Sequence, residues 1–455
     1  MQVTKINSSS ITANSFMLKP NFHMNFGKRR IERARKQGLE FQPLGNVVDK
    51  VFTGGIFKRV FVDEAEYGLP YISAQHMMNS NPLEVAKIIS KKYTPRQDDM
   101  SLKENQILIS CAGTVGNVKL ITKDLEGVIG SQDIIRVDAD NNKLLYGYLY
   151  AFLSSKTAYT YIQSFIYGSV VPRIEPNTLK KLPIPILSEE FQQKIHNLIA
   201  DAAQMRVEAN KLLREAVEIF EKEIGESKVT HSFQVGKISS NKIYGFHKRF
   251  DSQYQLGWNA LDKEKKNNLE YIKLAQVACN IFVGGRGKRN YVENGVPFLS
   301  SSDMMLFNPK RNCKKISGST QGIESMKVSL NDILISRSGT VGNTVIVGKD
   351  LEGTAISEHA LRLVIDEKLI SPFYVYTFLK TNYGMKTMES SSFGSVIITL
   401  NEDLIGNIEI PILNEDLQNK IIDLTKKYIA NYDLATNFEN QAIDLIEKEI
   451  DQWQQ

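Results

Sequence analysis

The chain has 455 residues, of which 42% are hydrophobic and 24% are charged, and these values are typical of a globular protein with roughly two to four domains. No apolar run reaches about 18 residues and the N-terminal residues are polar, which excludes membrane-spanning helices and a secretory signal peptide. Three widely spaced cysteines argue against a disulfide framework or a zinc site and favour a reducing cytoplasm, while a net charge of +5 is compatible with a polyanionic partner without establishing one.

The first part of the chain combines short strands with a few helices. Residues 1–21, rich in Ser, Asn and Thr, predict a flexible tail. A basic helix is expected at Lys28–Gly38, and a tyrosine-rich amphipathic helix at Leu144–Ser164. Because strands and helices do not alternate regularly, the fold class predicted is α+β. The β-rich segments, separated by turn residues, are Leu44–Phe52, Pro70–Ser73, Gln106–Ser110, Asn117–Thr122 and Gly127–Val137.

A long helix with one apolar seam is predicted at Ser188–Ile224, after a proline-bearing strand at Leu182–Leu187. Apolar residues recur in alternating steps of four and three, which is the a/d spacing of a coiled coil. At about 1.5 Å per residue the helix is a rod of roughly 55 Å. A seam of this kind requires a partner. Its main residues are Phe191, Ile195, Leu198, Met205, Leu212 and Ile219.

The second half of the chain repeats the first at an offset of 226 residues. Ser110–Asn117 (SCAGTVGN) corresponds to Ser336–Asn343 (SRSGTVGN), and both Lys123–Gly127 and Lys349–Gly353 read KDLEG. A helix at Gln253–Asn268 corresponds to the basic helix, and Ile370–Glu389 to the tyrosine-rich one. A second long helix, Asn414–Ile450, carries the same seam at Leu417, Ile421, Leu424, Tyr428, Phe438 and Leu445.

The repeat predicts two similar globular domains in tandem, each followed by a long helix. Two such helices in one chain most simply pack against each other, and an antiparallel coiled coil would hold the preceding domains at opposite ends. The predicted divisions are a tail at 1–21, a first repeat at 22–187, a central helix at 188–225, a second repeat at 226–413 and a C-terminal helix at 414–455.

Motifs of catalysis are absent from the sequence. No two prolines are adjacent, which removes the Asn/Asp-Pro-Pro-aromatic loop that holds a flipped base in amino-methyltransferases. There is no GxxxxGK[ST] phosphate loop, GxGxxG turn, HExxH or GxSxG, and no Pro-Asp dipeptide of the kind found in restriction nucleases. The chain is therefore expected to bind rather than to catalyse, with no metal site and no cofactor of its own.

The order of motifs resembles the specificity subunit of Type I restriction–modification systems, from about residue 22 to the end. Each copy has a GG turn followed by Gly-x-Pro and a Ser (Gly54–Ser73; Gly284–Ser300), and then an ILIS segment with GTVG (Ile107–Gly116; Ile333–Gly342). A Gly-Ser turn, an Ile-Pro-Ile strand and the helix start Glu189–Ile195 complete the set, with a looser match near Asp416. Each motif is degenerate, but the ordered set occurring twice is specific.

The resemblance implies two target-recognition domains joined by an antiparallel helical pair. It implies double-stranded DNA as the ligand, with each domain recognising one half of a bipartite target and the helices fixing the gap. It also implies assembly with two methyltransferase subunits, which would bring S-adenosylmethionine, and with restriction/translocase subunits. Outward faces of the helices (Lys194, Arg206, Lys211, Arg214, Lys420, Lys426 and Lys427) are candidates for docking these subunits or are simply solvated.

Candidate DNA contacts are basic and polar residues in segments where the two copies differ, because the two half-sites should differ. Gln, Ser and Arg make directional bonds to base edges, and Lys mostly contacts phosphate. For each residue a solvated surface position is the alternative. The first-copy candidates are Lys28, Arg29, Arg30, Arg33, Lys58, Arg59, Gln75, His76, Lys91, Lys92 and Arg96, and those of the second are Arg286, Lys288, Arg289, Ser301, Ser302, Lys310 and Arg311.

Two other functions remain open at this point. A self-sufficient DNA nuclease or methyltransferase with degenerate motifs would modify DNA as the purified chain alone. A two-headed protein adaptor, in which the basic segments are incidental, would not retain duplex DNA at low salt.

Overall fold

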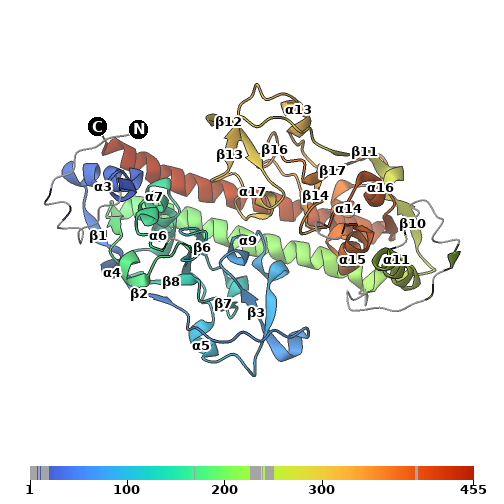
Figure 1. The fold of residues 1–455 in the computed structure, drawn as a ribbon, viewed down its shortest axis with the longest axis horizontal. Coiled ribbons are helices and arrows are strands. Elements are labelled where there is room, and N and C mark those ends of the chain that lie inside the picture. The colour runs from blue at the N-terminus through green and yellow to red at the C-terminus, as the bar shows by residue number, and fades with distance from the viewer. Residues whose placement is uncertain are drawn as a thin grey trace. The chain divides into compact units, whose positions relative to one another are not determined.

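The computed structural model describes residues 20–168, 170–225, 251–394 and 398–454, together with residues 8, 11, 237, 239, 240 and 249. By its internal contacts the chain forms two units. Unit 1 comprises Met1–Val207 and Leu434–Gln455, and unit 2 comprises Glu208–Asp433. Both are α+β, as predicted (Figure 1). The predicted tail and the first part of the predicted second repeat lie almost wholly outside the described residues, as do Ser169, Ser395 and Val396 of the Gly-Ser turns.

Unit 1 contains three small sheets. The largest is antiparallel in the order β2-β8-β5-β6, and the second, β4-β3-β7, joins β3 to β7 in parallel. The third pairs β1 with β9, so that the chain closes on itself immediately before the long helix. The strands are β1 (Phe41–Pro43), β2 (Val48–Thr53), β3 (Gly68–Ile72), β4 (Lys87–Ser90), β5 (Ile107–Ser110), β6 (Val118–Leu120), β7 (Ile129–Gly130), β8 (Ile134–Ala139) and β9 (Pro183–Pro185).

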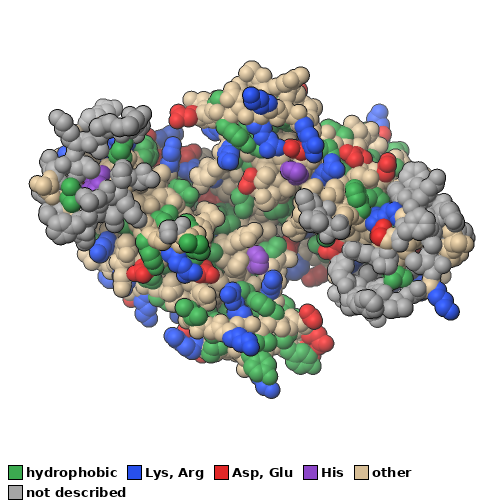
Figure 2. All heavy atoms as spheres, in the orientation of Figure 1, with side chains coloured by type: hydrophobic (Ala, Val, Ile, Leu, Met, Phe, Trp, Pro, Cys, Tyr) green, Lys and Arg blue, Asp and Glu red, His purple; other side chains and the backbone are tan. Residues whose placement is uncertain are grey.

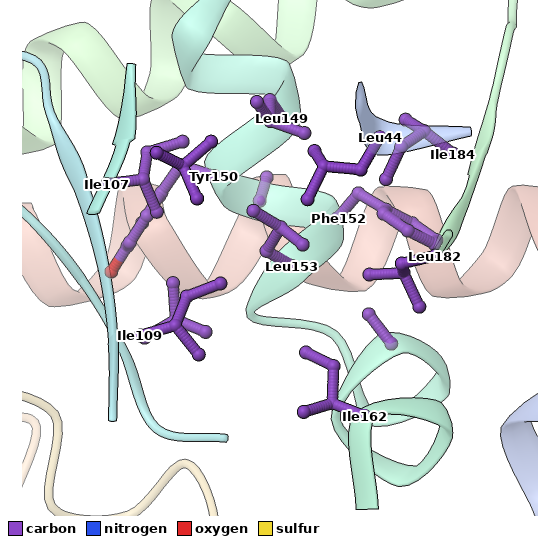
Figure 3. Close-up of a cluster of buried hydrophobic side chains, with 14 of the residues drawn as sticks. Leu44, Ile107, Ile109, Leu149, Tyr150, Phe152, Leu153, Ile162, Leu182 and Ile184 are labelled. Atoms are coloured by element: carbon purple, nitrogen blue, oxygen red, sulfur yellow. The ribbon is translucent and has the colours of Figure 1, made fainter. Parts of the chain in front are cut away.

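Helices of unit 1 form a core with the largest sheet. Helix α6 (YGYLYAFL) is apolar on nearly all sides and is accordingly buried, and Figure 3 shows its side chains among those of the neighbouring strands. Tyr148 of α6 donates its hydroxyl hydrogen to the Pro185 carbonyl at 2.8 Å, which ties the helix to β9. The helices are α2 (Pro20–His23), α3 (Phe26–Lys36), α4 (Leu44–Val47), α5 (Gln97–Met100), α6 (Tyr146–Leu153), α7 (Lys156–Ser164) and α8 (Pro176–Leu179), with 3-10 turns at Ala65–Tyr67 (η1), His76–Met78 (η2), Pro82–Val85 (η3) and Lys123–Leu125 (η4).

Unit 2 repeats these sheets in the same order, as β11-β17-β14-β15, β13-β12-β16 and β10-β18. Tyr374 donates to the Pro411 carbonyl at 2.9 Å, the counterpart of the Tyr148 bond. The strands are β10 (Glu270–Lys273), β11 (Ala278–Val283), β12 (Tyr291–Leu299), β13 (Lys314–Ile316), β14 (Ile333–Ser336), β15 (Thr344–Ile346), β16 (Ala355–Ile356), β17 (Ala360–Ile365) and β18 (Glu409–Ile412), and the helices are α11 (Ser252–Glu264), α12 (Leu274–Val277), α13 (Ile323–Met326), α14 (Pro372–Lys380), α15 (Asn382–Ser391) and α16 (Glu402–Gly406), with η5 at Asp303–Met305.

The long helices α9 (Glu189–Ile224) and α17 (Glu415–Gln452) pair antiparallel, as predicted. In unit 1 the start of α9 shares a core with the end of α17, where Ile195 and Ile199 join Ile446 and Ile450. In unit 2 the end of α9 packs with the start of α17. Each unit thus contains one half of each long helix. No helix in the described residues combines the length and apolarity that crossing a bilayer requires.

The apolar stripe of each long helix is broader than a two-residue seam. Of the predicted seam, Ile195, Ile421 and Leu424 are buried, whereas the other nine residues are half-buried. Several of the most buried positions lie one residue further along α9, at Ile199, Leu213 and Phe220. The reason is that each helix half packs against a globular core as well as against the other helix, which requires a wider stripe than a free coiled coil. The half-buried predicted residues are Phe191, Leu198, Met205, Leu212, Ile219, Leu417, Tyr428, Phe438 and Leu445.

Two predicted helices, Leu144–Ser164 and Ile370–Glu389, are each two helices in the structure. The single helix expected at Leu144–Ser164 breaks between α6 and α7, because Ser155 adopts an extended conformation and caps α7 by accepting from the Ala158 N–H at 3.1 Å. Thr381 caps α15 in the same way.

Candidate nucleic-acid interface

A basic loop follows β2 in the first repeat, at Gly54–Arg59 (GGIFKR). Gly54 lies so close to the end of α5 that a Cβ there would be 2.5 Å from the Met100 Sδ, so the position favours glycine. Beyond it, Ile56 is 88% exposed and Lys58 is exposed as well. Arg59 donates to the Tyr71 hydroxyl at 3.1 Å. The loop therefore presents an apolar side chain and a lysine while an arginine anchors it to β3.

Arg96 lies beside this loop. A Cβ at Gly55 would be 3.5 Å from the Arg96 Nη1, and the guanidinium pairs with Asp99 at 2.7 Å. The backbone of Arg96, the N-cap residue of α5, is left-handed, with φ 52°. Gly322, at φ 74°, occupies the corresponding position before α13 in the second repeat. A non-glycine residue in this conformation costs free energy, and such outliers cluster at functional sites.

A buried arginine supports the loop from below. Arg136 on β8 donates to the carbonyls of Gly130 at 2.8 Å and of Met100 at 3.3 Å. Burial lowers the pKa of its guanidinium to about 10. Since Gly130 ends β7, this side chain joins the two main sheets of unit 1 beneath Gly54. Sequence reasoning missed it, although Arg362 stands at the same place in the second copy and donates to the Met326 carbonyl at 3.0 Å.

The second repeat builds the same loop at Gly284–Arg289 (GGRGKR), after β11. Arg289 lies over the Phe298 ring at 4.8 Å and forms an ion pair with Glu358. The side chain of Arg286 is 79% exposed, and its Nε is 3.9 Å from the same carboxylate. Burial alone would raise the pKa of Glu358, but its backbone hydrogen bond and Arg289 more than offset this, and the pKa is lowered. The carboxylate is held ionised beside two cations.

The two loops share a pattern that an insertion conceals. Aligned on their glycines, both read GGxxKR, with Lys58 corresponding to Lys288 and Arg59 to Arg289. Each arginine rests on an aromatic residue of the following strand, Tyr71 or Phe298. Two tip positions differ: Ile56 against Arg286, which are exposed, and Phe57 against Gly287, which are half-buried. Figure 2 shows lysine and arginine side chains with hydrophobic ones among them.

The remaining first-repeat candidates lie on the smaller sheet or after it. Gln75 is exposed and His76 is half-buried, and burial, with Lys87 nearby, lowers the pKa of His76. Lys91 donates to the Glu66 carbonyl at 3.2 Å, and Lys92 lies 5.5 Å from the Tyr93 ring centroid. These contacts leave both lysines exposed.

Second-repeat candidates beyond the loop divide into two places. Ser301 and Ser302 follow β12, and Ser302 hydrogen bonds to Ser300 at 3.0 Å. Lys310 pairs with Asp350 at 3.0 Å, and the backbone of Asp350 donates to Asp433 of α17 at 3.4 Å. Lys310, with Arg311 next to it in the same turn, is therefore linked through Asp350 to α17.

The basic N-terminal helix corrects part of the prediction. Lys28 and Arg30 are buried on α3. Lys28 lies 3.7 Å from the Phe22 ring centroid, and burial lowers its pKa. Arg30 pairs with Glu447 at 2.5 Å and with Asp451. Arg30 therefore holds α3 to α17, and neither buried side chain is available to DNA. Arg29 and Arg33 face solvent and stay predictions.

A second correction concerns Arg206, which was expected on an outward helix face. It is 8% exposed and forms an ion pair with Glu439 of α17. Tyr150 of α6 donates its hydroxyl hydrogen to the other oxygen of Glu439. Lys119 on β6 is also buried there, and desolvation, with Arg206 nearby, lowers its pKa to about 7. Arg206 lies seven residues from both Ile199 and Leu213, in the buried column beside the predicted seam, so the wider stripe of α9 includes it.

Comparison with known proteins gives consistent matches. The sequence model of the Type I restriction modification DNA specificity domain matches residues 36–218 and again residues 268–445. The Type I restriction enzyme MjaVIII specificity subunit of Methanocaldococcus jannaschii is 22% identical over 403 residues, 86% of each chain. The MjaIX specificity subunit of the same organism is 25% identical over 159 residues, 33% of this chain and 36% of that protein. The S subunit of a Type I restriction–modification system from M. genitalium has a TM-score of 0.31 and 17% identity, over 92% of this chain and 96% of that one.

Proposed function

The chain belongs to the family of Type I restriction–modification DNA specificity domains, and we propose from this membership that it selects the DNA sequence on which a Type I restriction–modification complex acts. Its two family domains correspond to two target-recognition domains, each of which recognises one half of a bipartite site. The chain itself is non-catalytic and works in the cytoplasm, where the DNA of the cell lies.

The observation that carries this proposal is the GGxxKR loop in both repeats. Two domains that bind the same polymer at different sequences need common contacts to the phosphate backbone and different contacts to the bases. Lys58 and Lys288 are exposed at equivalent positions and are suited to phosphate. Their neighbouring arginines rest on equivalent aromatic residues, which fixes the direction of each loop.

Base selection belongs, on this proposal, to the residues that differ at the loop tips. Ile56 offers an apolar surface of the kind that contacts a thymine methyl group or wedges between base steps. Arg286 offers a guanidinium that can donate two hydrogen bonds to guanine. Glu358 replaces Gln132 of the first repeat and would accept from cytosine or adenine amino groups. Gln75, His76, Arg96, Ser301 and Ser302 flank these loops as secondary candidates.

Partner subunits supply the chemistry that the chain lacks. We assign methyl transfer to two methyltransferase subunits carrying S-adenosylmethionine, and cleavage to restriction/translocase subunits. Exposed lysines and arginines of the long helices, such as Lys194, Lys211, Arg214 and Lys426, are docking candidates. The length of the helical pair sets the number of base pairs between the half-sites. Removing seven residues from each long helix should shorten that gap and leave both half-sites recognisable, and an unchanged gap would contradict this role.

The direct experiment is to map modified bases across the genome with and without the gene for this chain. A bipartite motif should lose its modification when the gene is deleted and regain it on complementation. Unchanged modification in the deletion strain would contradict the proposal. Methylation or cleavage by the purified chain alone would show instead that it is catalytic.

A further inference from the structure

The two long helices are related by the same 226-residue offset as the rest of the chain, and contacts at both of their ends recur in similar form. Gln192 of α9 donates to the Leu187 carbonyl at 2.8 Å, and its counterpart Gln418 of α17 donates to the Leu413 carbonyl at 2.7 Å. At the other ends, Glu447 accepts from the Thr157 N–H at 2.8 Å, and Glu221 accepts from the Asn382 N–H at the same distance. The two helices thus share the spacing of their apolar residues and several contacts at their ends.

Because the two helices share their apolar spacing, each could also pair with the same helix of a second chain. If α9 can pair antiparallel with α17, it can in principle pair in the same way with α9 of a second chain, and α17 with α17. Two chains would then exchange helices and associate. Most seam positions do not prevent this, because they are apolar in both helices at the same spacing, although polar Asn431 stands at the position of Met205.

Buried charged residues at one position along the helical pair distinguish α9–α17 pairing from α9–α9 and α17–α17 pairing. Glu439 of α17 accepts from Arg206 of α9 and from Tyr150, and all three side chains are buried in unit 1. The counterparts in unit 2 are uncharged. Leu213 stands where Glu439 would be, and Tyr432, where Arg206 would be, lies 6.0 Å from Tyr428 between ring centroids and donates to the Phe307 carbonyl at 3.0 Å.

We propose that the buried Arg206–Glu439 pair, with Tyr150, makes α9 select α17 and reject the α9 of a second copy, and makes α17 reject a second α17. In an α9–α9 pair Arg206 would face Leu213, and in an α17–α17 pair Glu439 would face Tyr432. Either pairing buries charges without their partners, twice over by symmetry, which is strongly unfavourable. The pair in the native arrangement serves specificity in the way that a polar residue fixes register and partner in a coiled coil. This inference goes beyond DNA recognition and does not depend on it.

Complementary full-length variants test the proposal. R206E places two carboxylates at the buried level and E439R places two guanidinium groups there, so each variant alone is mismatched. The two variants are co-expressed with different affinity tags. If each chain pairs its α9 with the α17 of the other chain, a Glu–Arg pair is restored in both copies of unit 1. Co-purification of the two tags should exceed that of two wild-type chains at least tenfold. The R206E/E439R variant in one chain restores the pair internally and should behave as wild type.

A second variant tests the loss of discrimination directly. K119V/R206Y/E439L gives unit 1 the residues that unit 2 already holds at these positions, Val345, Tyr432 and Leu213. Two differently tagged copies of this variant should co-purify well above the wild-type level. The proposal is overturned if R206E and E439R co-purify no more than two wild-type chains do. This holds even if the two variants fail to fold when co-expressed, because the proposal requires each chain to rescue the other. DNA binding is not a readout in either experiment, so failure here leaves the proposed recognition function unaffected.

Discussion

Replacing Lys58 and Lys288 together with alanine should weaken DNA binding without changing which sequence is preferred. Both side chains are exposed on equivalent loops, and neither lies at the tip position that differs between the repeats. Each phosphate contact contributes about 0.9 to the steepness with which the logarithm of the DNA association constant falls against the logarithm of salt concentration. The slope of the double variant should therefore be about 1.8 shallower than that of the wild type. At 0.1 M salt this corresponds to binding about 60-fold weaker, or about 1.2 kcal/mol for each lysine.

The assay is fluorescence anisotropy of a labelled duplex, titrated with the assembled complex between about 50 and 300 mM salt. The matched control is K143A/K368A, because these two exposed lysines lie in the turns after β8 and β17, at the far ends of the strands from the GGxxKR loops. The control should keep the wild-type slope. A wild-type slope in K58A/K288A would refute the phosphate assignment, and a changed sequence preference would show that these lysines contact bases.

Three further predictions concern single positions. R96G should keep or raise stability to urea by up to about 1 kcal/mol, because it relieves a left-handed backbone, yet weaken binding to DNA. The pKa of Lys119 is lowered to about 7 in the folded protein, so above that pH the unfolded chain binds one more proton and stability rises with pH. Between about pH 7 and 9 the free energy of urea unfolding of the wild type should rise by about 2 kcal/mol relative to that of K119M. Equal pH profiles for the two proteins would contradict this. E447A should lower the free energy of unfolding by about 3 kcal/mol and E221A by about 1 kcal/mol, measured by thermal unfolding. Both variants remove a carboxylate that caps a helix, but only Glu447 also pairs with Arg30. Equal losses would argue against a role for that ion pair.

The fold was largely predictable because its signals are periodic. The heptad spacing in each long helix and the recurrence of GTVGN and KDLEG at one offset are enough to predict two like domains and two like helices. The split between α6 and α7 was not predicted, because Ser155 lies within a continuous amphipathic pattern and acts through its extended backbone and its cap.

The site was less predictable, for two physical reasons. The first repeat has extra residues between Arg59 and Gly68 of β3, so the offset at the loops is not 226. At the offset of 226, Lys58–Arg59 and Lys288–Arg289 are not compared with each other, and their equivalence is hidden. Burial of charge is the other reason. Nothing in the local sequence distinguishes Arg30, which forms buried ion pairs, from Arg33 of the same helix, which is exposed.

The central claim is that one chain carries two separate DNA-recognition domains, and mapping modified bases in cells expressing I56R tests it most directly. Ile56 is 88% exposed at the tip of the first loop, so the variant should fold normally. The account predicts that one half of the bipartite motif changes while the other half and the gap stay as in the wild type. A change in both halves together, or no change in either, would contradict it.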